Sequence, residues 1–336
     1  MRFGYSDTCL EHDTGPRHPE NPDRLRAIRE GLKGCHNIRY TDAEPADLTD
    51  IKRAHDDEYV EEFRTFCADG GGEWDPDTVA VEATWDAALA AAGLASWAAR
   101  RALAGDDGRD TPFSLGRPPG HHAVYDDAMG FCFINNAAVA AEHALRTTDA
   151  ERVAIFDWDV HHGNGTQDIF YEREDVFYGS IHEDGLYPGT GASEETGAGA
   201  GEGTTMNVPL PPGAGDPAYL ETMDACFAPA LAAFDPDLLL VSAGFDAHRH
   251  DPISRMHVST EGYGALTSSV REIAAESDAA VGFVLEGGYG LDTLSESICM
   301  VHETFDGYEP VPDEGEIDAE AQEVIDSVAA QGLGSK

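Results

Sequence analysis

The chain has 336 residues, enough for one large α/β domain or two smaller ones. Its 64 acidic and 21 basic residues give a formal charge of −43, which argues against binding to nucleic acid or to an anionic membrane. The hydrophobic fraction of 41% predicts a packed core rather than disorder.

No linker rich in proline and serine divides the chain, so we expect a single domain over residues 1–310. An acidic tail, 311–336, follows, with a short solvated surface helix at about 317–328. We interpret the acidity as adaptation to a very salty cytosol, where concentrated cations screen the repulsion between carboxylates. The sequence leaves the oligomeric state open.

The six cysteines are scattered without a C-x-x-C pair, which predicts reduced thiols and neither a disulfide framework nor a zinc ribbon. The first residues lack the apolar core of a signal peptide, and no stretch is long enough to span a bilayer. We therefore expect a cytoplasmic protein.

Apolar, β-rich runs and helical patterns alternate along the chain. We predict helices at 84–103, 135–146, 217–234 and 261–276, and strands at 111–116, 153–157, 237–243 and 280–285. This alternation predicts an α/β fold with a parallel sheet covered by helices on both faces. Each predicted strand is followed at once by reactive side chains, and ligands bind beyond the carboxyl ends of such strands. The polar clusters should converge on one crevice.

The most informative of these runs ends in Asp157, Asp159 and His161. Residues two apart in a strand share a face, so this spacing puts two carboxylates and an imidazole side by side, as in a metal site. Taken alone, the pattern fits a loop that begins with polar residues equally well.

Six motifs follow one another in a specific order: R-P-P-G-H-H-A, M-G-F-C-F-I-N-N, D-W-D-V-H-H-G-N-G-T-Q, Y-P-G-T-G, S-A-G-F-D-A and L-E-G-G-Y-G. With them the chain resembles the zinc-dependent deacetylases from His18 to about residue 305. That group includes class II histone deacetylases, acetylpolyamine amidohydrolases and acetoin-utilisation proteins. The resemblance implies a three-layer arginase/deacetylase-like fold and a hydrolase that removes acetyl groups from lysine-like amines with metal-activated water.

Asp159, His161 and Asp246 are the expected metal ligands. Two carboxylates and a neutral imidazole balance the charge of Zn²⁺ and leave positions open for water and substrate, and the resemblance implies the same three residues. Ferrous iron remains an alternative to zinc. The spacing alone does not separate ligand Asp159 from Asp157.

The resemblance implies a second, buried monovalent cation, for which potassium is our expectation. It would lie at Asp157, near the carbonyl groups of Ser180 and Ile181.

The resemblance also implies the residues that move protons. His122 would take a proton from the attacking water and give it to the leaving amine, while His121, paired with Asp157, would be an electrostatic partner. Asn164 stands where relatives often have Asp; as a neutral partner it should leave His122 uncharged more readily near pH 7. Tyr289 would donate its phenol to the substrate carbonyl as charge builds there. A bare His-His pair or a lone tyrosine would otherwise be read as surface or packing residues.

The resemblance implies a narrow apolar tunnel for an alkyl stem at Gly130, Phe131, Leu186 and Tyr187, although from the sequence alone the two aromatic residues would be read as core. Asp77 and Ile253 are expected at its rim. Arg24 either lines an exit route for acetate or forms a structural salt bridge.

The sequence disfavours two other functions. A two-manganese ureohydrolase would need an aspartate two residues beyond Asp246, where this chain has His248. A catalytically silent binder of acyl ligands would be expected to lack at least one site residue. Within the deacetylases, acetyl-lysine, acetylpolyamines and other small acylamines all remain open as substrates. Ile253 stands where one polyamine-selective branch has glutamate, and it favours acyl-lysine.

A nucleotide-binding role for the glycine-rich stretch 197–203 is disfavoured, because it follows no strand and opens no helix.

Overall fold

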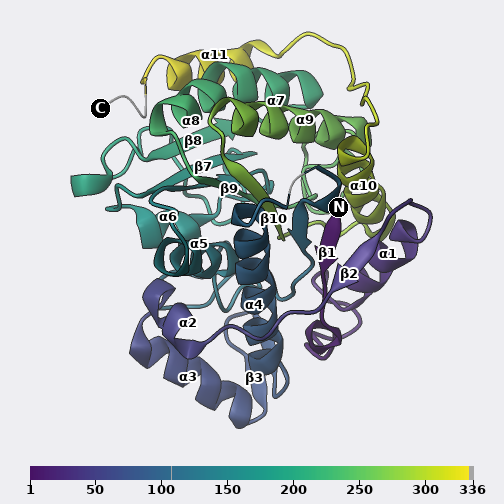
Figure 1. The fold of residues 1–336 in the computed structure, drawn as a ribbon, viewed down its shortest axis with the longest axis vertical. Helices are drawn as coiled ribbons and strands as arrows, with labels where there is room; N and C mark the ends of the chain where they lie inside the picture. The colour runs from purple at the N-terminus through teal and green to yellow at the C-terminus, as the bar shows by residue number, and fades with distance from the viewer. Residues whose placement is uncertain (107, 333–336) are drawn as a thin grey trace.

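The computed structural model describes residues 1–106 and 108–332. Its centre is an eight-stranded sheet in which every neighbouring pair of strands is parallel (Figure 1). The strand order is β2 (Arg39–Thr41), β1 (Arg2–Gly4), β5 (Pro112–Ser114), β10 (Ala280–Leu285), β9 (Leu238–Ala243), β6 (Val153–Asp157), β7 (Val176–Glu183) and β8 (Thr205–Leu210). The predicted α/β class with a parallel sheet is confirmed.

Four strands of this sheet escaped prediction, namely β1, β2, β7 and β8. β1 and β2 have only three residues each, too few for a periodic pattern. β7 and β8 mix apolar residues with glycine, histidine, asparagine and proline, so their composition does not mark them as strands. The glycine-rich stretch 197–203 contains one short 3-10 turn, Gly199–Gly201, and then runs into β8; no α-helix begins there.

The four helices expected at 84–103, 135–146, 217–234 and 261–276 are present, whereas α1, α2, α3, α6 and α10 were not predicted. The predicted helix 84–103 is α4, and the predicted helix 217–234 forms two α-helices joined by a π-helical turn at Met223–Phe227. The full set is α1 (Asp23–Leu32), α2 (Leu48–Ala54), α3 (Asp57–Ala68), α4 (Thr84–Leu103), α5 (Asn136–Thr147), α6 (Asn164–Phe170), α7 (Asp216–Thr222), α8 (Ala228–Phe234), α9 (Thr260–Glu276), α10 (Leu291–Phe305) and α11 (Ala319–Ala329).

The sheet is buried on both faces, and successive strand residues serve opposite faces. In β6, Ala154 and Phe156 join a core packed under α7 to α11, whereas Val153 and Ile155 join a second core packed against α2 to α5. Figure 1 shows these two groups of helices on opposite sides of the sheet. Helices cover both faces of the sheet, so a ligand reaches the sheet itself at the strand ends.

A small antiparallel hairpin, β3 (Gly71–Glu73) and β4 (Val79–Val81), stands apart from the sheet. Its turn is held by Asp75, whose carboxylate accepts the N–H groups of Asp77 and Thr78 at 3.0 and 2.6 Å. The Thr78 hydroxyl in turn accepts the N–H of Phe131 at 3.1 Å. The hairpin is therefore tied to the segment expected to form the tunnel.

The expectation of a solvated C-terminal helix is wrong for one face of α11. Ala321, Ile325 and Val328 are buried in the main core, and the helix packs beside β8, the edge strand of the sheet. The sequence was read as a surface helix because acidic residues dominate it; the apolar stripe covers an edge strand that would otherwise be open. Residues 333–336 of the predicted tail lie outside the described part of the chain.

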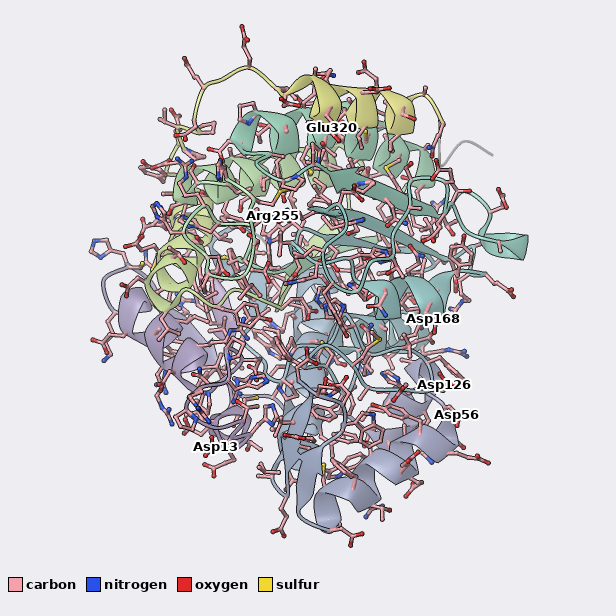
Figure 2. The ribbon with its side chains drawn as sticks, turned by 180° about the vertical axis from the view of Figure 1, so that it is seen from behind. Asp13, Asp56, Asp126, Asp168, Arg255 and Glu320 are labelled. Atoms are coloured by element: carbon pink, nitrogen blue, oxygen red, sulfur yellow. The ribbon has the colours of Figure 1, made fainter. Side chains whose placement is uncertain are left out.

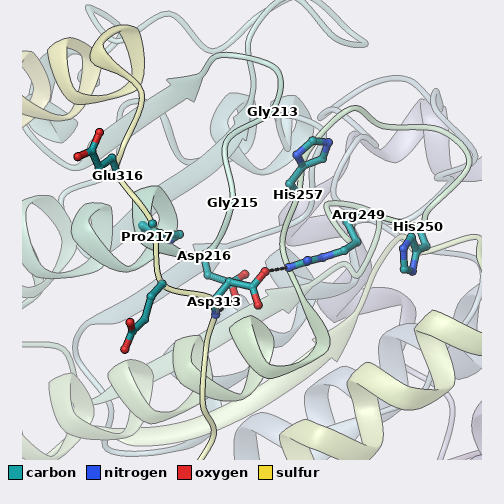
Figure 3. A pocket seen from close by; sticks show the side chains of 11 residues that line it. Gly213, Gly215, Asp216, Pro217, Arg249, His250, His257, Asp313 and Glu316 are labelled. Atoms are coloured by element: carbon teal, nitrogen blue, oxygen red, sulfur yellow. Dashed lines mark hydrogen bonds and ion pairs between the residues drawn. The ribbon is translucent and has the colours of Figure 1, made fainter.

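The segment before α11 crosses the loop that follows Asp246. Asp313 pairs with Arg249 at 2.5 Å and donates its N–H to Asp216 at 2.8 Å (Figure 3). A cavity of about 490 Å³ lies between the two segments, lined on the tail side by Glu314 and Glu316. The C-terminal segment therefore braces a loop that leads toward the predicted site.

Figure 2 labels five acidic residues: Glu320 at the top, Asp13 at the lower left, and Asp56, Asp126 and Asp168 near one another on the right. All six cysteines are free thiols. Within the described residues, no helix combines the length and apolar character needed to cross a bilayer.

Candidate active site

The structure brings the three predicted metal ligands together. Asp159 and His161 follow β6 and Asp246 follows β9, and their ligand atoms all lie within 4.8 Å of one another. The His161 Nδ1 lies 2.9 Å from an Asp159 oxygen and 3.3 Å from Asp246 Oδ2. β6 ends at Asp157, so the strand periodicity used to group these residues does not extend to Asp159 and His161. Both belong to the loop that follows β6.

Backbone contacts fix the two carboxylates. Asp246 Oδ1 accepts the N–H of Val160 at 2.9 Å, and Asp159 Oδ2 accepts the N–H of Gly287 at 2.7 Å. A Cβ on Gly287 would lie 2.1 Å from Asp246 Oδ2, so only glycine permits this approach. Asp246 Oδ2 itself is buried and has no hydrogen-bond partner among the described residues. An orphaned carboxylate oxygen beside an imidazole nitrogen fits a cation ligand.

The charges around this cluster favour a cation. Burial disfavours imidazolium, but the Asp159 and Asp246 carboxylates outweigh it and raise the pKa of His161 to about 10. Burial also raises the pKa of Asp246, and the neighbouring Asp159 carboxylate adds to this rise. Two carboxylates and one imidazole that compete for protons in a buried site are suited to a divalent ion.

Asp157 lies one layer deeper than the ligands. Its Oδ2 is 3.0 Å from His121 Nδ1, and its Oδ1 accepts the N–H of Asp159 at 3.0 Å. Burial lowers the pKa of His121, but the Asp159 and Asp157 carboxylates overcome this effect and raise it to about 10. Asp157 also pairs in register with Ser180 on β7, next to the buried Ile181. The residues predicted to surround a monovalent cation are therefore neighbours.

His122 faces a defined amide partner. Its Nδ1 is 2.8 Å from Asn164 Oδ1, and Asn164 Nδ2 donates to the His122 carbonyl at 3.4 Å. The amide oxygen can only accept, so Nδ1 carries the proton and Nε2 is left as a base. Burial, followed by the charges of His121 and His161, holds the pKa of His122 well below its usual range, whereas the Asn164 hydrogen bond raises it. His122 is therefore neutral, as the sequence suggested. The main cause is burial and the charges of His121 and His161, and not the neutral Asn164 named in the sequence analysis.

Tyr289 approaches the cluster from the loop between β10 and α10. Its ring lies 5.9 Å from Phe131, and Arg24 lies over it with Cζ 5.1 Å from the ring centre. Burial raises the pKa of Tyr289 well above its usual value, although Arg24 opposes the rise. The phenol therefore stays protonated at neutral pH and can act as a donor.

Gly130 and Tyr187 lie against His122. The Tyr187 ring is 5.1 Å from the His122 ring and perpendicular to it, and a Cβ on Gly130 would lie 2.5 Å from the His122 ring. Phe131 is half-buried and Tyr187 is 38% exposed, so neither is a core residue. Leu186 differs, because it packs against the main core.

The rim residues lie on separate loops. Asp77 sits in the turn of the β3–β4 hairpin, where its carbonyl accepts a hydrogen bond from His18, whose ring contacts Phe131 at 4.7 Å. Burial and the neighbouring Asp75 raise the pKa of Asp77. Ile253 is half-buried and donates its N–H to Asp251 at 3.1 Å.

Arg24 is completely buried and forms a structural salt bridge, one of the two roles that the sequence left open for it. It contacts Glu20 at 3.3 Å and donates to the carbonyl groups of Gly288 and Glu286. It thereby holds the loop that carries Tyr289.

Comparison with known proteins accords with this geometry. The family model described as "Histone deacetylase domain" matches residues 18–305, which is most of the chain. The chain belongs to the histone deacetylase family.

Relatives within the histone deacetylase family come from bacteria, archaea and eukaryotes. The chain is 40% identical to the histone deacetylase-like amidohydrolase of Pseudomonas aeruginosa over 85% of this chain and 81% of that protein. It is 42% identical to a probable deacetylase of Methanothermobacter thermautotrophicus over 87% and 88% of the two chains. The crystal structure of the HDA15 HD domain superimposes with a TM-score of 0.90 at 35% identity, over 98% of this chain and 95% of that one.

In this member of the histone deacetylase family, His248 is not placed as a metal ligand. It bonds to the Thr260 hydroxyl at 3.1 Å and accepts the N–H of His250 at 3.2 Å. The position that a ureohydrolase needs for a bridging carboxylate is therefore occupied by a ring engaged elsewhere.

Two buried carboxylates near the site were missed in the sequence. Glu286 accepts the N–H groups of Gly120 and His121 at 2.8 and 3.2 Å, which ties the tyrosine loop to the histidine loop. Asp251 accepts the N–H groups of Tyr289 and Gly290 at 2.7 and 2.9 Å. The signal for Glu286 was available, since it follows directly after a buried strand; Asp251 lies in a loop and gave none.

Proposed function

We propose that this protein is a zinc-dependent amide hydrolase that removes acetyl or related acyl groups from lysine-like amines. The observation that carries the proposal is the convergence of Asp159, His161 and Asp246 beside the neutral His122 and the protonated Tyr289. A metal-ligand cluster, a base and an oxyanion donor are the parts that hydrolysis of an unactivated amide requires.

The donor set fits zinc. Asp159, Asp246 and His161 Nδ1 would hold the ion, and three protein ligands leave room for water and a substrate oxygen. When bound, zinc would lower the pKa of water and polarise the acyl carbonyl. Ferrous iron is compatible with the same ligands, and metal analysis of the purified protein separates the two.

His122 supplies the proton transfers in this proposal. The Nδ1–H of His122 donates a hydrogen bond to Asn164, which leaves Nε2 as the base. Nε2 accepts the proton of the attacking water and later delivers it to the leaving amine nitrogen. Tyr289 donates its O–H to the acyl oxygen as negative charge develops there. His121 contributes positive charge, balanced by Asp157 at 3.0 Å.

We further propose that potassium binds at Asp157, Ser180 and Ile181. The support is their adjacency on β6 and β7 next to the ligand loop. Potassium would brace the loop that carries Asp159 and His161, and its replacement by a smaller monovalent cation should alter turnover.

The proposed substrate is an acylated amine with a linear alkyl stem. Phe131 and Tyr187 offer apolar walls close to Tyr289 and His122, which suits methylene groups. Parallel turnover of an acetyl-lysine peptide and of acetylated polyamines in high potassium chloride tests this choice. Faster turnover of the polyamines would assign the chain to the alternative, a deacetylase of acetylpolyamines or other small acylamines.

The acidic surface supports a proposal about the working environment. We propose that the protein works in a salty cytoplasm, because a formal charge of −43 makes its carboxylates repel one another strongly unless salt screens them. The unfolding midpoint should rise between dilute buffer and molar potassium chloride; a flat or falling curve would contradict this.

A further inference from the structure

Asp251 makes contacts that none of the proposed catalytic roles uses. It is 7% exposed and lies in the loop that follows Asp246, five residues beyond that ligand. Its Oδ2 accepts two hydrogen bonds from the neighbouring tyrosine loop, from the N–H of Tyr289 at 2.7 Å and of Gly290 at 2.9 Å. Its Oδ1 accepts the N–H of Ile253 in its own loop at 3.1 Å. One carboxylate thus joins the metal loop to the tyrosine loop.

The tyrosine loop needs such a partner because glycines surround Tyr289. Gly288 adopts a φ of +114°, a conformation open mainly to glycine, and Gly290 follows on the other side. Arg24 holds the carbonyl groups of Glu286 and Gly288, and Asp159 holds the N–H of Gly287. At Tyr289 and Gly290, the side-chain contact to the backbone N–H groups comes from Asp251.

The charge on Asp251 strengthens this contact. Burial raises its pKa to about 6, with a further rise from the Asp246 carboxylate, so it is ionised at neutral pH. Hydrogen bonds from N–H groups to an ionised carboxylate are about twice as strong as those between neutral groups. The loop that carries Asp251 is itself anchored from outside by the Arg249–Asp313 pair and by Arg255 on Glu183.

We infer that Asp251 is a positioning residue for Tyr289, setting the backbone from which the phenol reaches the acyl oxygen. The inference rests on the proposed role of Tyr289 in amide hydrolysis. It assigns Asp251 no contact with substrate or metal. Its effect on turnover must therefore pass through the Tyr289 hydroxyl.

A double-mutant cycle tests this directly. The variants are Asp251→Ala, Tyr289→Phe and their combination, assayed for kcat, KM and bound metal with an acetyl-lysine peptide. Asp251→Ala alone should lower kcat about 10- to 100-fold with metal content unchanged, since small misplacements of a catalytic group have effects of this size. In the Tyr289→Phe background the same substitution should lower kcat less than about 2-fold, because the hydroxyl it positions is already gone.

Two further variants keep the test decisive. Asp251→Asn retains one oxygen that can accept the N–H groups of Tyr289 and Gly290, and it should recover part of the lost kcat. Asp237→Ala, just before β9 and away from the tyrosine loop, removes another carboxylate that accepts two backbone N–H groups, from Glu151 at 2.8 Å and Arg152 at 2.9 Å. Its effect on kcat should be the same with and without the Tyr289 hydroxyl.

The outcomes separate the two ideas. Equal losses from Asp251→Ala in both backgrounds, loss of bound metal, or unchanged kcat in the single variant would each overturn the positioning role while leaving the proposed function intact. Full turnover in Tyr289→Phe alone would remove Tyr289 from the proposed mechanism and the positioning role with it.

Discussion

The half of the site proposed to bind the metal and the half proposed to form the tunnel, below called the metal-binding half and the tunnel half, are built differently. Asp159 and Asp246 are fully buried, directly follow the central strands β6 and β9, and are fixed by backbone N–H groups. Phe131 and Tyr187 stand on long loops, are partly exposed, and depend on unusual backbone at Gly130 and Phe131, with φ of +56° and +70°. The charged half is rigid because the sheet positions it, whereas the tunnel half depends on loops that must be held by one another.

The largest effect is expected in the metal-binding half. Asp246→Ala or His161→Ala should abolish metal binding and activity together, because two remaining ligands do not retain an open-coordinate ion. Metal content and turnover of an acetyl-lysine peptide measure this. Asp237→Ala, at the opposite end of β9, is the control and should keep both, since its carboxylate accepts the N–H groups of Glu151 and Arg152, away from the ligand cluster. Stoichiometric zinc with normal turnover in either ligand variant would remove that residue from the ligand set.

Tyr289 joins the two halves and should rank next. Tyr289→Phe is expected to lower kcat by about 10²–10³, the usual effect of losing one oxyanion donor, with metal content unchanged. Tyr263→Phe is a matched control, because its buried hydroxyl has no hydrogen-bond partner among the described residues. Comparable losses in the two variants would show that removal of a buried hydroxyl, rather than an oxyanion donor, is what matters.

Two glycine substitutions, Gly130→Ala and Gly189→Ala, test the tunnel half. Gly130→Ala should lower kcat about 10-fold or more, because the new Cβ would lie 2.5 Å from the His122 ring and displace it. Gly189→Ala introduces the same kind of backbone strain, at φ +80°, but meets open space. Both variants should lose about 1 kcal/mol of stability, and only Gly130→Ala should lose turnover. Equal turnover in the two would contradict the contact between Gly130 and His122.

The smallest effect is expected at the rim. Ile253→Glu should raise kcat/KM for an acetylated polyamine relative to an acetyl-lysine peptide by a few-fold, because a partly exposed ion pair contributes only about 1 kcal/mol. The ratio of the two specificity constants is the measurement. An unmoved ratio would place Ile253 away from the substrate's cationic end.

The difference between the two halves also explains what the sequence could predict. Carboxylates and histidines that follow apolar strands are visible in the sequence, so it predicts a polar cluster at the strand ends, and Asp159, His161 and Asp246 do lie together. The choice of Asp159 over Asp157 and the roles of His122 and Tyr289 came from the family resemblance. Strands such as β1 and β2 were missed because, unlike the equally short β5, they lead into none of the six motifs. Loop-to-loop contacts such as Asp251 to Tyr289 were missed because they join residues 38 apart in sequence and depend on how two turns meet in space.

The burial of α11 could have been predicted only in part. Its apolar residues at 321, 325 and 328 have helical spacing, but the sequence did not reveal that β8, itself unpredicted, is the edge strand they cover. The error in one element therefore followed from the omission of another.

Metal removal and restoration tests the central claim most directly. The protein is stripped with a chelator in high potassium chloride, and turnover of an acetyl-lysine peptide is followed as zinc is added back. We predict that activity is lost on stripping and returns in proportion to bound zinc, reaching its full value at one ion per chain. Full turnover by the metal-free protein, or one bound zinc per chain with no turnover of any acylated amine, would contradict the account.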